Sequence, residues 1–177
     1  ARSHDGVLDR AAIAAAAKTK GIAAVAVCDH DKSPQAGDFP AKVEGDVLFI
    51  PAIEYSTERG HLLGLFLARP VAEPPTGKRM PFADAAAEIR AAGGLAILAH
   101  PFEQADDFAA RAREIEPLLP HLDGIEVFNS RADYKHGGAN AAAAQFAAVH
   151  GITCVTAGSD AHRGAEVGNA FVEADCP

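Results

Sequence analysis

Short apolar runs alternate with longer segments of helical periodicity along most of the chain. The short runs have strand length, whereas the longer ones repeat their apolar positions every three to four residues. Strands are predicted at residues 22–28, 47–53, 61–67, 95–99, 124–128, 152–156 and 168–173. Helices are predicted at 10–20, 82–92, 105–119 and 139–150, and loops or turns at 32–46, 55–60 and 69–80.

The first helix shows clear end signals, because Asp9 is a suitable N-cap and Gly21 a suitable stop. The run that follows, 22–28, is apolar without interruption, which is typical of a parallel strand covered on both faces. Strands and helices alternate over short connections, so we expect an α/β protein with a mostly parallel sheet, either open or closed into a barrel. In both architectures the functional groups gather at the carboxyl ends of the strands.

Histidines and carboxylates stand where these predicted strands end. The clearest case is Gly158-Ser159-Asp160-Ala161-His162, because Asp160 and His162 project to the same side if the chain stays extended. His61 begins its strand, but it follows Glu54 across a tight turn and can face the same rim. The strand-end residues are Asp29, His30, Asp31, Glu54, His100, Glu126 or Asn129, Asp160 and His162.

So many imidazoles and carboxylates at one rim require cations, and more than one. A mixed set of this kind suits Zn, Mn or Fe. Taken singly, the residues also have ordinary explanations: Asp29 and Asp31 as loop caps, and Glu54 as a salt-bridged strand end. Outside this set, His4 is ambiguous. The remaining histidines are interpreted as solvated or helix-end residues: His121, His136 and His150.

Composition narrows the class of protein further. A chain of 177 residues with 49% hydrophobic residues is expected to form one domain, 1–177, and no apolar run approaches membrane-spanning length. The net charge of −8 argues against a nucleic-acid partner bound through a basic surface. Three scattered cysteines without a CxxC pattern favour a reducing location, the cytoplasm.

Five motifs together resemble the PHP family (polymerase and histidinol phosphatase), and the resemblance covers essentially the whole chain in order and spacing. They are Ser3-His4-Asp5-Gly6, Cys28-Asp29-His30-Asp31, Ala52-Ile53-Glu54 with Gly60-His61-Leu62-Leu63-Gly64, Ala99-His100-Pro101, and Gly158-Ser159-Asp160-Ala161-His162. The resemblance implies a distorted (β/α)7 TIM-like barrel, with two to three divalent metal ions at its carboxyl rim, that hydrolyses phosphate esters.

The resemblance also implies a ligand set. Glu54 would bridge two metals, and His61 and His100 would complete the second. Asp160 would help to bind the first, His30 and His162 would hold the third, and Asp5 is an additional ligand candidate.

One departure from the family concerns the beginning of the barrel. The family opens with a strand that ends in His-x-His and directly precedes the Ser3 turn, and the sequence given starts at Ala1. The expectation is therefore a barrel that lacks its first strand in this sequence, with the downstream ligands intact. Cys28 stands where the family often has Thr, a lesser departure.

The expected reaction is attack of a metal-activated water on the phosphorus of a small-molecule phosphate or nucleotide. The predicted catalytic residues are Glu54, Asp160 and His162, and His162 or His30 is the candidate donor of a proton to the leaving oxygen. Arg131 and Arg163 follow strand ends and are the candidates for gripping the phosphate.

Three other readings stay open from the sequence. The first is a nuclease acting on short oligonucleotides. The second is a non-catalytic PHP-like metal-binding domain. The third is a metal-dependent amidohydrolase, which is disfavoured because no Lys ends a strand here to bridge the metals.

Overall fold

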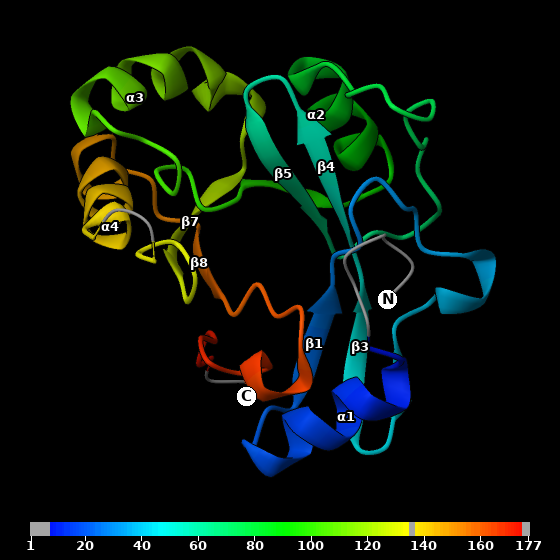
Figure 1. Ribbon diagram of the computed structural model, residues 1–177. Coiled ribbons are helices and arrows are strands. Elements are labelled where there is room, and N and C mark those ends of the chain that lie inside the picture. Colours follow the sequence, from blue (N-terminus) through cyan, green and yellow to red (C-terminus); the bar gives the residue numbers. More distant parts are fainter. Residues whose placement is uncertain (1–7, 135–136, 175–177) are drawn as a thin grey trace.

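The computed structural model describes residues 8–134 and 137–174. Their strands form two sheets that follow one another around a common interior (Figure 1). A three-stranded sheet has the order β1 (Ala24–Val27), β3 (Val47–Pro51), β2 (Lys42–Glu44). A five-stranded sheet has the order β4 (Ile53–Thr57), β5 (Gly60–Leu65), β6 (Leu95–Leu98), β7 (Gly124–Asn129), β8 (Val155–Gly158).

The helices lie outside the sheets, as Figure 1 shows. Helices α2 (Phe82–Ala91) and α4 (Ala139–Val149) cover the five-stranded sheet, and α3 (Phe108–Ile115) packs beside α4. Helix α1 (Arg10–Thr19) covers β3 and β2. Short 3-10 turns occupy Ala36–Asp38 (η1), Glu116–His121 (η2) and Gly164–Glu166 (η3). None of the helices in the described ranges has the length and apolar character needed to cross a bilayer.

Two apolar clusters hold these layers together. The larger one fills the space between the five-stranded sheet and its helices, with Ile53, Leu62, Ile89, Leu98 and Ile125 fully buried. The smaller one lies between α1 and the three-stranded sheet and includes Ile13, Ala17, Val47 and Phe49. Each sheet buries one apolar face against its helices. Its opposite face is therefore directed toward the interior that the two sheets share.

The α/β class is confirmed, whereas the mostly parallel sheet is a wrong expectation. Strand β5 runs antiparallel to both β4 and β6, and β2 runs antiparallel to β3. The turn between Thr57 and Gly60 is too short for a crossover, so β4 and β5 can only pair as a hairpin. The polar turn predicted at 55–60 is therefore a strand as far as Thr57.

The strand predicted at 168–173 is also wrong. Gly168 has a left-handed φ of 74°, and the Lys20 ammonium donates to Asn169 Oδ1 at 2.7 Å and to Ala165 O at 3.2 Å. These contacts hold the segment against the end of α1 instead of a sheet.

No closed barrel forms among the described residues. Strand β1 pairs on one side only, with β3, and β8 pairs on one side only, with β7. Residues from both unpaired edges line a single cavity of about 280 Å³.

Candidate metal centre

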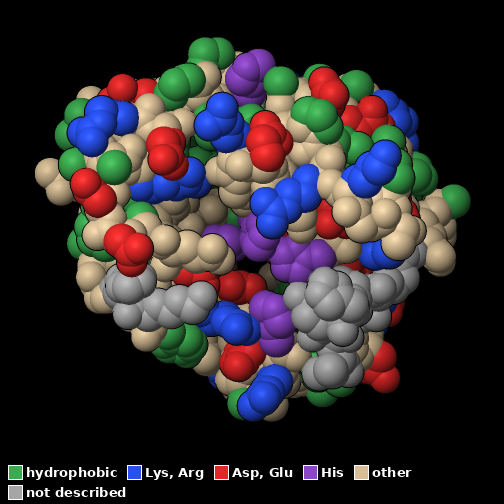
Figure 2. All heavy atoms as spheres, turned by 45° about the horizontal axis from the view of Figure 1, so that its top comes forward, with side chains coloured by type: hydrophobic (Ala, Val, Ile, Leu, Met, Phe, Trp, Pro, Cys, Tyr) green, Lys and Arg blue, Asp and Glu red, His purple; other side chains and the backbone are tan. Residues whose placement is uncertain are grey.

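The cavity between β1 and β8 contains most of the predicted site residues. Its lining includes His30, Glu54, His100, Asp160 and His162, from four separate segments of the chain. Figure 2 shows histidine side chains gathered around a hollow in this face, with acidic side chains beside them. Residues that follow predicted strands far apart in the sequence therefore lie together at this cavity.

Glu54 lies at the centre of one half of this site. It is the second residue of β4, and the residue is 7% exposed. In the β4–β5 hairpin Ser56 lies opposite His61, so Glu54 and His61 are diagonal neighbours on one face of the sheet. His61 Nδ1 consequently lies 2.8 Å from Glu54 Oε1.

His30 reaches Glu54 through the backbone that joins the two sheets. Glu54 N–H donates to Asp29 O at 3.2 Å, and Asp31 N–H donates to Glu54 O at 2.8 Å. This single parallel bridge brings His30 Nε2 to 3.8 Å from Glu54 Oε2. The ligand atoms of His30, Glu54 and His61 all lie within 4.8 Å of one another.

His100 completes this group from the end of β6. Its Nε2 lies 3.4 Å from Glu54 Oε1 and 3.3 Å from His61 Nδ1, and its Nδ1 lies 3.2 Å from Glu103 Oε2. The backbone of His100 has a φ of 26°, in the left-handed region that an L-residue adopts only under constraint. In this conformation the imidazole points toward Glu54.

Electrostatics of the group favour a positive charge beside Glu54. Burial opposes ionisation of Glu54, but hydrogen bonds with His100 and His61 and the charge of His30 outweigh it and hold the pKa of Glu54 below its ordinary value. Burial likewise works against the His100 cation, yet the hydrogen bond with Glu54 raises the pKa of His100 to about 9. Without a metal, a proton on His100 supplies the positive charge that this carboxylate requires.

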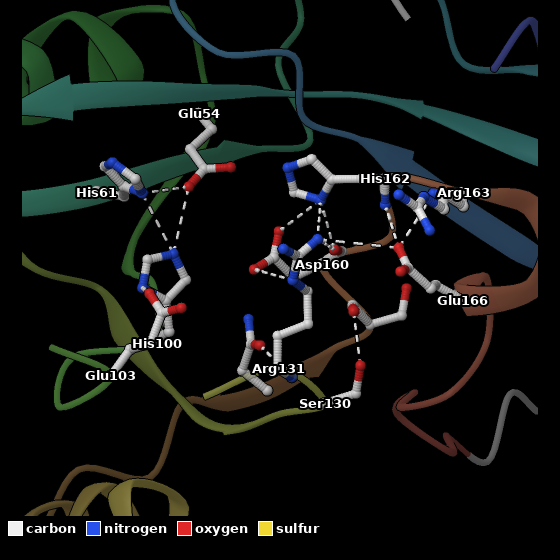
Figure 3. A network of polar contacts seen from close by, with 12 residues as sticks. Glu54, His61, His100, Glu103, Ser130, Arg131, Asp160, His162, Arg163 and Glu166 are labelled. Atoms are coloured by element: carbon white, nitrogen blue, oxygen red, sulfur yellow. Dashed lines mark hydrogen bonds and ion pairs between the residues drawn. The ribbon is translucent and has the colours of Figure 1, made fainter. Parts of the chain in front are cut away.

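Asp160 and His162 face Glu54 from the other wall of the cavity, after β8 (Figure 3). The backbone of Asp160 also has a left-handed φ, 49°. Burial, followed by the charge of Glu54, raises the pKa of the Asp160 carboxyl. His162 Nδ1 lies 2.9 Å from Asp160 O, and its backbone N–H donates to Glu166 Oε2 at 2.7 Å.

Arg131 lies against this second group rather than in solvent. Its Nη1 contacts His162 Nδ1 at 2.5 Å, and its Nε lies 3.9 Å from Asp160 Oδ2 (Figure 3). Arg163 differs: it is exposed, and its backbone N–H donates to Glu166. The two arginines singled out in the sequence therefore have different surroundings, and only Arg131 contacts the candidate ligands.

The donor set fits divalent metals. Three imidazoles and one buried carboxylate bring their nitrogen and oxygen atoms together, and a second carboxylate and imidazole face them across the cavity. Two imidazole nitrogens only 3.3 Å apart, His61 Nδ1 and His100 Nε2, must share a proton or direct their lone pairs at a cation. Mixed histidine and carboxylate donors suit Zn, Mn or Fe.

The structure brings together six of the seven predicted metal ligands: His30, Glu54, His61, His100, Asp160 and His162. The seventh, Asp5, lies outside the described residues. Sequence reasoning missed Glu103 and Glu166, which contact His100 and His162. Glu103 follows His100 by three residues and Glu166 follows His162 by four, a spacing that permits a contact without specifying it.

Comparisons with known proteins place this geometry in context. Residues 137–177 match a family model described as PHP-associated. The uncharacterised protein MJ1587 of Methanocaldococcus jannaschii is 32% identical over 128 residues, which are 71% of this chain and 69% of that protein. The uncharacterised protein MJ0417 of the same organism is 30% identical over 151 residues, 84% of this chain, and the chain spans 56% of its length.

Solved structures show the same fold at low sequence identity. A Chromobacterium violaceum amidohydrolase, with bound sulfate and no metal, has a TM-score of 0.67 and 18% identity over 93% of this chain and 85% of that one. A candidate metal-dependent phosphoesterase from Bifidobacterium adolescentis has a TM-score of 0.68 and 15% identity, over 96% and 88%. A two-domain Bacteroides vulgatus protein containing a predicted PHP-like metal-dependent phosphoesterase has a TM-score of 0.57 and 18% identity, over 90% and 49%.

The five sequence motifs, the clustering around one cavity of the histidines and carboxylates of the four motifs that the structure describes, and these relatives agree with one another. The chain belongs to the PHP family.

Proposed function

We propose that this protein hydrolyses a phosphate ester of a small molecule or nucleotide at a centre of two to three divalent metal ions. The observation that carries the proposal is the convergence of His30, His61 and His100 on the buried carboxylate of Glu54. The similar C. violaceum structure holds a sulfate, a tetrahedral oxyanion like phosphate, which supports an anionic substrate.

The proposed roles follow from the two halves of the site. Glu54 would bridge two cations, with His61, His100 and His30 beside it and Asp160 across the cavity, and Asp5 is kept as an additional ligand. Cations bound there would acidify water and neutralise charge that develops on the phosphoryl oxygens. His162 either joins the ligands or donates a proton to the leaving oxygen, because both roles use Nε2 while Nδ1 faces Arg131 and Asp160.

Arg131 is proposed as the phosphate-gripping residue, since a guanidinium matches two phosphoryl oxygens at once. Its contacts with His162 and Asp160 keep it beside the proposed ligands without filling its five donors. Arg163 keeps the same proposed role only as the weaker candidate, because its side chain is exposed.

We further propose that the two sheets belong to a distorted (β/α)7 TIM-like barrel, with one more strand between β1 and β8. The unpaired edges of both strands face one cavity, and the buried Thr156 Oγ1 has no hydrogen-bond partner in the described structure. The family resemblance supplies a strand for this place, one that ends in His-x-His. Free thiols at Cys28 and Cys154 agree with the proposed reducing, cytoplasmic location.

The test combines turnover with metal content. Wild-type protein should bind Mn²⁺ or Zn²⁺ and hydrolyse p-nitrophenyl phosphate, and a panel of sugar phosphates, nucleotides and short oligonucleotides then defines the substrate. Glu54→Ala should stay folded by circular dichroism but lose bound metal, and its kcat/KM should fall about 100-fold or more.

Glu44→Ala is the matched control, because it removes a carboxylate on β2 that pairs with Arg10 outside the cavity. This variant should keep full metal content and activity. Full metal content in Glu54→Ala, measured by elemental analysis, would refute the bridging role.

A further inference from the structure

Glu126 is a buried carboxylate in the lining of the same cavity as the candidate ligands, and the proposed reaction does not use it. It lies in the middle of β7 with 4% exposure, and no arginine or lysine pairs with it in the described structure. Its Oε2 accepts two hydrogen bonds, one from the His100 backbone N–H at 2.8 Å and one from Asn129 Nδ2 at 3.0 Å. Burial of a carboxylate costs free energy. The two hydrogen bonds to Glu126 therefore indicate that it has a specific structural role.

A bulge in β7 creates this arrangement. Glu126 pairs with Thr156 and Phe128 with Ala157, so Val127 is an extra residue in the strand. Without the bulge, Asn129 would point away from the side of Glu126, because side chains alternate along a strand. With it, both polar side chains lie on one side and bind each other.

The hydrogen bond to His100 acts on the backbone that carries a proposed ligand. His100 has a strained φ of 26°, and in that conformation its Nε2 lies 3.4 Å from Glu54 Oε1. The residue before a proline, here Pro101, is already restricted in its backbone. The Glu126 oxygen that accepts the His100 N–H restricts the backbone of His100 further.

The other oxygen of Glu126 lies against β8. A Cβ added at Gly158 would overlap Glu126 Oε1, so the glycine is what lets the two strands fit around this side chain. Gly158 precedes the Asp160 turn by two residues. Glu126 therefore sits between the segments that carry His100 and Asp160, the two proposed ligands with left-handed backbones.

We infer that Glu126 is a positioning residue: it holds the His100 and Asp160 segments at the spacing that metal binding requires, without ligating the metal itself. The inference rests on the proposed metal centre. Residues that orient metal ligands typically change metal affinity 10–100-fold when they are removed. The effect should depend on the acceptor oxygen of residue 126 and not on its negative charge.

The experiment compares two variants of nearly the same shape, Glu126→Gln and Glu126→Met. Isothermal titration with Mn²⁺ or Zn²⁺ measures the affinity of each metal-free protein, and the absorption spectrum of the Co²⁺-loaded protein reports the ligand geometry. Gln keeps a carbonyl oxygen for the His100 N–H, so its affinity should stay within about threefold of wild type and its Co²⁺ spectrum unchanged. Met has no such acceptor, so its affinity should fall about 10–100-fold with an altered spectrum.

Asp123→Ala is the control for a loss of stability alone. Asp123 also accepts a backbone N–H of the β6 strand, from Ala96 at 2.8 Å, but at the far end from His100. This variant should unfold more easily than wild type yet bind metal with unchanged affinity.

Each outcome bears on a different statement. Equal affinities for wild type and Glu126→Met would overturn the positioning role alone. A loss of metal affinity in Glu126→Gln would also overturn the positioning role, in favour of direct ligation of the metal through Glu126 Oε1. This measurement can be made even if Glu126→Met fails to fold. Absence of metal binding in the wild type would overturn the proposed function and this inference together.

Discussion

Asp123, the residue before β7, secures the start of β6, and its replacement by alanine should destabilise the protein measurably. Its Oδ2 accepts the Ala96 N–H at 2.8 Å, and its own N–H donates to Ala96 O at 2.8 Å. The Arg90 guanidinium donates to the carboxylate through Nε at 3.2 Å and Nη2 at 3.0 Å. Ala96 is fully buried, so its N–H would lose its partner inside the sheet.

The magnitude follows from these contacts. A hydrogen bond from a backbone N–H to a carboxylate contributes about 1.5–3 kcal/mol, and a partly exposed pair such as Arg90–Asp123 contributes under about 1 kcal/mol. We expect Asp123→Ala to lower the free energy of unfolding by about 2–3 kcal/mol. In a chain of this length that corresponds to a drop in Tm of about 4–12 °C. Arg90→Ala removes only the ion pair and should cost about 0.5 kcal/mol.

The difference should depend on pH in a defined direction. Burial raises the pKa of Asp123, but the bonds from Arg90 and the Ala96 N–H outweigh it, so the pKa lies below its ordinary value of 3.8. A carboxyl with a lowered pKa in the folded state stabilises the protein above its ordinary pKa and loses that contribution as the pH falls through the lowered value. The difference in the free energy of unfolding between wild type and Asp123→Ala should be fully present at pH 7 and should decrease below about pH 4.

Urea unfolding followed by far-ultraviolet circular dichroism at pH 7 and in acid measures these differences. Arg90→Ala is the control, because it leaves the Ala96 bond in place. If Asp123→Ala and Arg90→Ala destabilise the protein equally, the bond to Ala96 contributes nothing and the reasoning is refuted.

Three further outcomes are expected. Gly124→Ala should destabilise the protein by more than about 3 kcal/mol or prevent folding, because its Cβ would overlap the carbonyl oxygen of Cys154, and a soluble variant with wild-type Tm would contradict this. Arg131→Ala should lower kcat/KM for a phosphate monoester about 10–100-fold, against less than about threefold for Arg163→Ala, and equal losses would remove the distinction. Saturating Mn²⁺ or Zn²⁺ should raise the Tm of wild-type protein but not of Glu54→Ala, and EDTA should reverse the shift.

The helices were the most predictable part of the fold. Helix α1 begins where Asp9 caps it, with Asp9 Oδ1 accepting the Ala12 N–H at 2.7 Å, and the chain turns at Gly21 with a φ of 71°. Such end signals are local, so the sequence displays them directly. The β4–β5 hairpin was not predictable in the same way, because the polar Ser56 and Thr57 resemble a turn until the partner strand is known. Tyr55 is fully buried, and its hydroxyl donates to Ala72 O.

For the candidate site, the most useful sequence argument was that functional groups gather at the carboxyl ends of the strands. It brought His30, His100 and Asp160 to one cavity although 130 residues of sequence separate the first from the last. The same argument also predicted that Glu54 lies near these residues. Its premise was incomplete, because Glu54 lies inside β4 and not after a strand. The contacts of Glu103 and Glu166 depend on loop conformations, which spacing in the sequence does not specify.

The left-handed backbones of His100 and Asp160 have a consequence for how such a chain evolves. Glycine adopts these angles without the cost that an imidazole- or carboxylate-bearing residue incurs. Natural selection for thermal robustness alone would therefore favour glycine at both positions, whereas the proposed ligand roles require the two side chains. In descendants that no longer need the proposed reaction, glycine should spread at positions 100 and 160 before the surrounding core changes.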